Sequence, residues 1–220
     1  MNLHTNTLTQ VTWLGLRRRL LQIKKKGRAE YRVFWRLLNS QNHGVPQHRP
    51  RVYVIGLRKD AQVCKFKWPA KTQQTDLGLF LRTQMQDWPG QAAPPRPMSK
   101  TNARNLALGL QTLRQDGLNP EATDAVIDIG HGRKGKVAMM IGRCPAITRT
   151  RAATQDYYLT SMRRRLSESE LMSLQGLKPH EAKIFHGISR RQKMMMVGNG
   201  MTINVLTGVL RQSLRATGLI

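Results

Sequence analysis

The sequence has few acidic residues. Only 12 Asp and Glu stand against 37 Lys and Arg, so the formal net charge of the 220 residues is +25. This excess of positive charge is larger than the surface of an ordinary globular protein carries, and it favours a polyanionic partner. The hydrophobic share is 40%, and adding the 18 Gly and leaving out the 4 Tyr gives an apolar share of about 46%, which lies in the globular range and excludes a simple disordered basic tail.

Cysteine and long apolar runs are also scarce. Cys64 and Cys144 have no companion cysteines, which excludes a disulfide framework and a zinc site of paired cysteines and indicates a reducing compartment. His43 and His48 are spaced unsuitably for a helical metal pair, so we expect no metal. No window approaches the roughly 18 uncharged apolar residues of a membrane span. The polar first ten residues lack a secretory signal, so we expect no membrane partner.

Hydrophobic periodicity and turn residues predict the secondary structure. The pattern indicates helices over residues 11–26, 101–115 and 204–215, strands over 31–35 and 51–57, and a hairpin of 126–129 with 137–141. Ser99 is expected to cap the second helix, and a capping box at Ser167 predicts a further short one. Residues 58–98 are expected to be mostly irregular. The final helix is expected to bury five apolar side chains, Val205, Leu206, Val209, Leu210 and Leu214.

Two glycine-rich segments could approach a ligand closely. The basic segment at residues 130–135 lacks P-loop spacing and precedes a strand, so we interpret it as a hairpin tip and not as a phosphate loop. At residues 197–202, two glycines around an Asn predict a tight backbone turn.

Residues 44–51 read GVPQHRPR and continue into the predicted strand 51–57. This stretch closely resembles the eighth conserved motif of DNA (cytosine-5) methyltransferases. In the family's order, RRLSESELMSLQG at 164–176 resembles the ninth motif and VGNGMT at 197–202 the tenth. CPAITRTR at 144–151 is similar to the threonine-rich end of the target-recognition domain. A generic Arg-Pro-Arg surface loop would not explain these ordered matches.

The resemblance implies an α/β fold. The chain would comprise the C-terminal portion of a Rossmann-like S-adenosylmethionine-dependent methyltransferase core and a mixed α+β target-recognition lobe. Residues 1–60 would hold the last helix and strands of the core, 61–160 the lobe, and 161–220 a helical segment returning to the core. The implied reaction transfers methyl from S-adenosylmethionine to C5 of a cytosine flipped out of double-stranded DNA. The implied location is intracellular and contains DNA: the nucleus in a eukaryote, the cytoplasm in a bacterium.

The resemblance also assigns roles to individual residues. Arg51 would hold O2 of the flipped cytosine, and Arg49 would steady the catalytic loop. Gln47 would either occupy the gap left in the base stack or brace the loop. The DNA near the target would be contacted by Thr148 and Arg149, and the methyl-donor pocket would be lined by Gly198 and Asn199.

Three catalytic segments of the family are missing. They are the Pro-Cys loop with the nucleophile that attacks C6, a Glu-Asn-Val segment and a glycine-rich turn for the cofactor. Neither cysteine stands in a Pro-Cys loop, so we interpret Cys64 and Cys144 as structural thiols. We therefore expect a fragment or split subunit that needs a complementary N-terminal half carrying the catalytic cysteine.

Two alternatives remain open from the sequence. One is a non-catalytic basic module that holds DNA or RNA through its phosphates. The other is ribosomal-type RNA binding, which fits the sequence pI of about 11.5 but leaves the three motifs unexplained.

Overall fold

The computed structural model describes residues 15, 18–19, 22–25, 28–84, 97–133 and 135–220. The chain forms two compact units. Unit 1 comprises Met1–Leu38, Arg51–Pro69 and Thr207–Ile220, and unit 2 comprises Asn39–Pro50 and Ala70–Leu206. Each unit is therefore built from separate stretches of the sequence, and the units cut across the three segments predicted above.

Strands β3 (Tyr31–Asn39) and β4 (Pro50–Arg58) are hydrogen-bonded neighbours and lie mostly in unit 1. Asn39 at the end of β3 and Pro50 at the start of β4 belong to unit 2. Side chains alternate between the two faces of a strand. On one face Phe34 stacks on Phe66 with ring centroids 4.9 Å apart, and Leu57 joins the same small core. The alternate residues of β3 point the other way, where Trp35 is 52% exposed.

The other face of this sheet is apolar and open to solvent. Besides Trp35, Leu37 of β3 and Val52 of β4 are nearly half exposed. The last helix, α7 (Ile203–Ala216), supplies Ala216 to the core on the covered face. Sequence periodicity predicted that Leu210 and Leu214 would be buried with Val205 and Val209, and this was wrong for both leucines, which are exposed. Both leucines lie outside the face of α7 that carries the buried Val205 and Val209.

The predicted helix over residues 11–26 falls largely outside the described residues. Its last part is wrong where it can be seen, because β1 (Lys24–Lys25) pairs antiparallel with β2 (Arg28–Ala29). The pairing gives hydrogen-bond partners to backbone N–H and C=O groups that the end of a helix would leave without partners.

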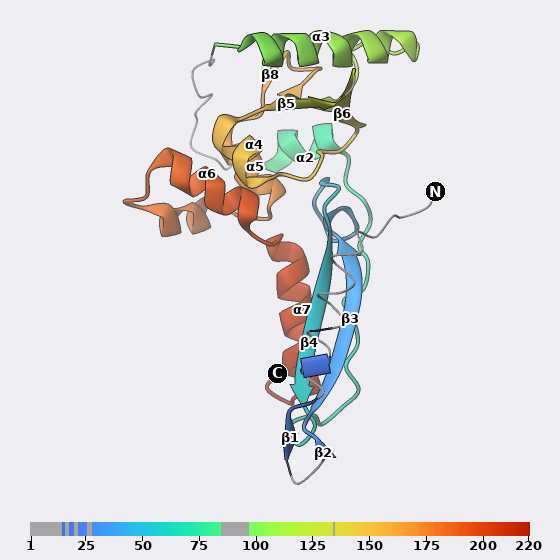
Figure 1. Ribbon diagram of the computed structural model, residues 1–220, viewed down its shortest axis with the longest axis vertical. Helices are drawn as coiled ribbons and strands as arrows, with labels where there is room; N and C mark the ends of the chain where they lie inside the picture. Colours follow the sequence, from blue (N-terminus) through green and yellow to red (C-terminus); the bar gives the residue numbers. More distant parts are fainter. Residues whose placement is uncertain (1–14, 16–17, 20–21, 26–27, 85–96, 134) are drawn as a thin grey trace. The chain divides into compact units, whose positions relative to one another are not determined.

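Unit 2 contains a four-stranded antiparallel sheet in the order β6-β5-β7-β8. The strands are β5 (Ala125–Arg133), β6 (Lys136–Ile141), β7 (Tyr157–Leu159) and β8 (Arg164–Arg165). Helix α3 (Lys100–Gln115) lies along one face of this sheet, as Figure 1 shows. Gly109 permits the close approach, because a Cβ there would lie 2.8 Å from Cδ1 of Ile127. The predicted hairpin and the Ser99 cap are both confirmed.

The remaining helices of unit 2 pack around a large apolar core. They are α2 (Leu77–Gln84), α4 (Arg149–Thr154), α5 (Glu168–Leu174) and α6 (Arg190–Asn199), with 3-10 turns η1 (Ser40–Asn42) and η2 (Pro179–Phe185). The capping box at Ser167 is confirmed at the start of α5. Helix α2 was missed, since its segment was expected to be irregular. Gly198 lies in the last turn of α6, so the tight turn predicted around it begins only at Gly200.

Candidate functional site

The loop that carries GVPQHRPR is fixed to residue 144 by backbone pairing. The Cys144 amide donates to the Pro46 carbonyl at 2.7 Å, and the His48 amide donates to the Cys144 carbonyl at 2.8 Å. At the end of the loop the Arg49 amide donates to Oδ1 of Asn39 at 2.9 Å. These bonds join the eighth-motif segment to the segment that resembles the end of the target-recognition domain.

Gln47 lies at the centre of this junction and is fully buried, at 0% exposure. Its Nε2 donates to the Leu174 carbonyl at 2.7 Å and to Oε1 of Gln175 at 3.3 Å. Its Oε1 accepts a long bond from the Ile147 amide at 3.4 Å. A side chain held in this way could fill a gap in a base stack only by giving up these bonds. The geometry therefore favours the loop-bracing role of the two that the resemblance allows.

Gln175 extends the same network to the tenth-motif segment. Its Nε2 donates to the Val197 carbonyl at 2.6 Å, and its Oε1 accepts from the Thr202 hydroxyl at 3.1 Å. The Thr202 hydroxyl in turn lies 2.7 Å from the Ser40 hydroxyl. Gln175, Thr202 and Ser40 are all buried. The three motif segments recognised in the sequence thus meet in one buried hydrogen-bond network.

Arg49 forms a second connection between the same segments. Arg49 is 3% exposed, and its Nη1 donates to the Ile147 carbonyl. Its Nη2 donates to the carbonyls of Gly198 at 3.0 Å and Gly200 at 2.7 Å. The last carbonyls of a helix lack partners inside the helix and carry partial negative charge, so a cation at this end of α6 is stabilising. We call this set of bonds the Arg49 clamp.

The clamp holds two backbones that are already in close contact. A Cβ on Gly198 would lie 2.6 Å from the Thr148 carbonyl carbon and 2.7 Å from Cα of Arg149. No side chain fits at Gly198, because backbone atoms cannot move aside as a flexible side chain can. Its glycine is explained by the packing of α6 against the start of α4.

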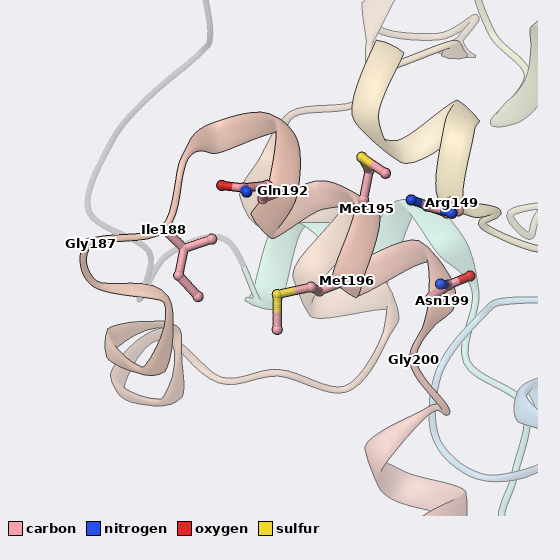
Figure 2. Close-up of a pocket in the computed structure, with 8 residues that line it drawn as sticks. All are labelled: Arg149, Gly187, Ile188, Gln192, Met195, Met196, Asn199 and Gly200. Atoms are coloured by element: carbon pink, nitrogen blue, oxygen red, sulfur yellow. The ribbon is translucent and has the colours of Figure 1, made fainter.

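The clamped segments border an open pocket of about 770 Å³. Arg149 comes from the start of α4, and the other side chains come from α6 and the residues just before it, as Figure 2 shows. The pocket is lined by Arg149, Ile188, Gln192, Met195, Met196 and Asn199, together with Gly187 and Gly200. Among the described residues Arg149 forms no ion pair, although Arg190 and Lys193 nearby both bind Glu168. The pocket therefore combines apolar surface, two amides and an available guanidinium.

The structure brings together most of the site residues that the sequence predicted. Gln47, Arg49, Thr148, Arg149, Gly198 and Asn199 all belong to unit 2. Thr148 and Arg149 are exposed at the start of α4, where the Thr148 side chain makes no capping bond and the Thr148 amide donates to the Tyr157 hydroxyl at 2.9 Å. Arg51 is exposed on β4 and belongs to unit 1.

Two structural features bear on the chemistry. Cys144 is completely buried, and the loss of hydration raises the pKa of its thiol well above the ordinary value, so it remains protonated and unsuited to nucleophilic attack. Cys64 is exposed.

Among the described residues no cluster of His, Cys, Asp or Glu could hold a metal ion, and no helix is long and apolar enough to cross a membrane.

The residues predicted to bind S-adenosylmethionine fit that group poorly on their own. Gly198 faces the backbone of Thr148 and Arg149, which leaves no space for a ligand there. Asn199 lines the pocket, but the described lining includes no carboxylate to accept bonds from the ammonium group of the cofactor. Gly198 and Asn199 therefore do not by themselves form a site for this group.

Comparison with known proteins identifies the family. The C-5 cytosine-specific DNA methylase family model matches residues 17–215, so the chain belongs to this family. It is 36% identical over 81 residues to the Type II methyltransferase M.FnuDI of Fusobacterium nucleatum, covering 37% of this chain and 23% of that one. It is 45% identical over 51 residues to M.BsuRI of Bacillus subtilis, covering 23% and 12%. The matched regions are thus less than a quarter of either relative.

A solved structure gives a more distant comparison. The structure of the Entamoeba histolytica methyltransferase EhMeth aligns with 96% of this chain and 58% of its own, at a TM-score of 0.49 and 10% identity.

Sequence reasoning did not single out Ser40, Gln175, Thr202, Gln192 or the methionines of α6. Gln175 lies in the ninth-motif segment, and its position in the "Leu-Gln-Gly" end of that motif could have indicated its role. No sequence pattern indicated the role of the methionines, because three consecutive methionines match neither a helical stripe nor a set of ligand-binding residues.

Proposed function

We propose that the chain acts in the methylation of C5 of cytosine in double-stranded DNA, with S-adenosylmethionine as the methyl donor. It supplies the part of the enzyme that reads the DNA and braces the catalytic loop, in an intracellular compartment that contains DNA. The observation that carries this proposal is the buried network of Gln47, Gln175 and Thr202, joined to the Arg49 clamp. These bonds unite the three segments that the family resemblance singled out.

The residue roles follow from burial. Arg49 and Gln47 are buried and bonded to protein backbone, which suits positioning groups that steady a loop. Thr148 and Arg149 are exposed on the surface next to the clamp and are available to DNA phosphates. Arg51 is exposed at the start of β4, as a group that holds O2 of a flipped cytosine must be.

The nucleophile comes from a complementary N-terminal half. Neither described thiol suits the role, because Cys144 is buried and protonated and Cys64 lies in unit 1 against the end of α7. The exposed apolar face of β3 and β4 supports this division. A two-stranded sheet is marginally stable alone, and an apolar face of this kind is normally covered by another part of a core.

The test uses tritium-labelled S-adenosylmethionine and duplex DNA. The full chain is mixed with the part of M.FnuDI that precedes its matched region, and each component is also assayed alone. Label should enter DNA only with the mixture. Arg51→Ala should reduce transfer at least tenfold, whereas Arg58→Ala, an exposed arginine on the same strand paired with Asp60, should change it less than twofold.

Two results would overturn the proposal. One is no transfer by the mixture, and the other is equal transfer by the Arg51 and Arg58 variants. A chain that binds DNA with a steep dependence on salt, but never supports transfer, is the non-catalytic binding module instead.

A further inference from the structure

We propose that Tyr157 is a positioning residue for DNA contact, because its hydroxyl holds the backbone that presents Thr148 and Arg149 to the phosphates. This inference rests on the proposed function, which gives the DNA contacts to Thr148 and Arg149. Tyr157 belongs to β7 and lies outside every segment that resembles a motif of the family.

The Tyr157 hydroxyl bridges the two peptide groups that flank Ile147. It donates to the Ala146 carbonyl at 3.0 Å and accepts from the Thr148 amide at 2.9 Å. Residues 145–148 have no regular secondary structure, so helix or strand pairing does not fix these backbone groups. Backbone groups in such a stretch need partners from elsewhere, and here one buried side chain provides two of them.

The eighth-motif loop holds the groups that lie between those two bonds of Tyr157. The Ile147 amide donates to Oε1 of Gln47 at 3.4 Å, and the Ile147 carbonyl accepts from Nη1 of Arg49. Four consecutive backbone polar groups therefore depend on three side chains, and Tyr157 supplies two of the four bonds. Removing its hydroxyl would release both ends of this stretch.

The hydroxyl is itself held in place. Tyr157 is 0% exposed, its backbone pairs with Asp128 of β5, and its carbonyl accepts from the Leu166 amide at 2.8 Å. Burial raises the pKa of the hydroxyl above its ordinary value of 10.0, although hydrogen bonds with Thr148 act in the opposite direction. At neutral pH the hydroxyl therefore keeps the proton that it donates to Ala146.

These bonds fix the backbone of Arg149 and leave its side chain available. Arg149 is exposed at the start of α4, and its guanidinium forms no ion pair among the described residues. Its backbone also packs closely on α6, because a Cβ on Gly198 would lie 2.7 Å from Cα of Arg149. A guanidinium on a fixed backbone needs less ordering when it meets a phosphate, which favours binding.

The test measures, by fluorescence anisotropy, how the affinity of the full chain for a labelled duplex depends on salt. The slope of log affinity against log salt reports phosphate contacts, at about 0.9 per contact in double-stranded DNA. Arg149→Ala should lower the slope by about 0.9. Tyr157→Phe, which removes only the hydroxyl, should lower it by a similar amount, because Arg149 then no longer reaches its phosphate. The double variant should lower it no further.

Tyr158→Phe is the matched control. Tyr158 follows Tyr157 in β7, and adjacent residues of a strand point to opposite faces of the sheet, so this variant should leave the slope unchanged. A purely structural loss would reduce the folded fraction and the apparent affinity, but not the number of phosphates that a folded molecule contacts. The slope therefore separates positioning from stability, even where Tyr157→Phe is partly unfolded.

The outcomes that contradict this inference differ from those that contradict the proposed function. An unchanged slope in Tyr157→Phe, with a lowered slope in Arg149→Ala, overturns the positioning role and leaves the proposed function standing. A slope that falls further in the double variant also overturns it, because the two residues then act separately. An unchanged slope in Arg149→Ala, or no binding by the unmodified chain, overturns the proposed DNA contact of Arg149 and this inference with it.

Discussion

The Arg49 guanidinium donates a hydrogen bond of 3.0 Å to the carbonyl of Gly198, 149 residues further along the chain. This bond joins the loop between β3 and β4 to the C-terminal end of α6. It makes the eighth and tenth motif segments parts of one structural site.

Replacing Arg49 should therefore destabilise unit 2. Arg49→Ala leaves carbonyls of Ile147, Gly198 and Gly200 without this donor, and we expect a loss of about 3 kcal/mol in the free energy of unfolding. Arg49→Lys should recover only part of it, because an ammonium lacks the planar fork. Urea denaturation followed by circular dichroism measures both. Arg114→Lys, at an exposed position near the end of α3, is the control, and equal stability of the two lysine variants would contradict the clamp.

Adding one methyl group at Gly198 should be costly. The new Cβ would overlap backbone atoms of Thr148 and Arg149, so α6 must shift away from α4. We expect Gly198→Ala to lower the free energy of unfolding by about 2 kcal/mol, within the 1–3 kcal/mol typical of overpacking. Gly56→Ala is the matched control, because its Cβ would meet only Cδ1 of Tyr31 at an ordinary 3.7 Å. Two variants with unchanged melting temperatures would argue against the close packing.

Gln47 and Gln175 should be energetically coupled. Their amides are in contact at 3.3 Å and share buried neighbours, so the effects of Gln47→Ala and Gln175→Ala should fail to add. We expect a coupling energy of about 1 kcal/mol from a double-mutant cycle in urea. A second cycle that pairs Gln47→Ala with Ser161→Ala should give additive effects, since no bond joins those side chains among the described contacts. Additivity in both cycles would refute the network.

The stability of the chain should fall in alkaline solution. Burial raises the pKa of the Cys144 thiol above its ordinary value of 9.0 and that of the Tyr157 hydroxyl above 10.0. The folded state therefore keeps these protons at a pH where the unfolded chain releases them. The contribution is complete below about pH 9 and decreases as the pH rises beyond it.

Urea denaturation at a series of pH values from 7 to 11 measures this decrease. Cys144→Ala should remove the part of the slope that begins near the ordinary thiol pKa of 9.0. A free energy of unfolding that is constant up to pH 11, or a slope unaffected by the substitution, would be inconsistent with a buried neutral thiol.

Local signals in the sequence predicted local structure well. The Ser99 cap, the capping box at Ser167 and the hairpin of β5 and β6 depend on short-range hydrogen bonds and side-chain alternation, and all are confirmed. Helix α2 was missed because its eight residues carry too few turns for a clear period, and tertiary contacts of Leu77 and Leu81 stabilise it.

Long-range features could not be predicted in the same way. The burial of Arg49 runs against the usual exposure of arginine, and it is explained only by carbonyls contributed from residues 147–200. The exposure of Leu210 and Leu214 likewise depends on which face of α7 is covered. The motif order identified the segments of the site, but the bonds between them required the structure.

The two thiols differ in a way that is useful in practice. Cys144 is buried in the core and protonated, whereas Cys64 is exposed. The Cys64 amide donates to the Ala216 carbonyl at 3.3 Å, near the end of α7. A maleimide dye at neutral pH should therefore mark one position of the native chain without any engineered cysteine. A fluorophore placed there would report on events in unit 1, and would make the arrival of a second polypeptide on that unit visible in real time.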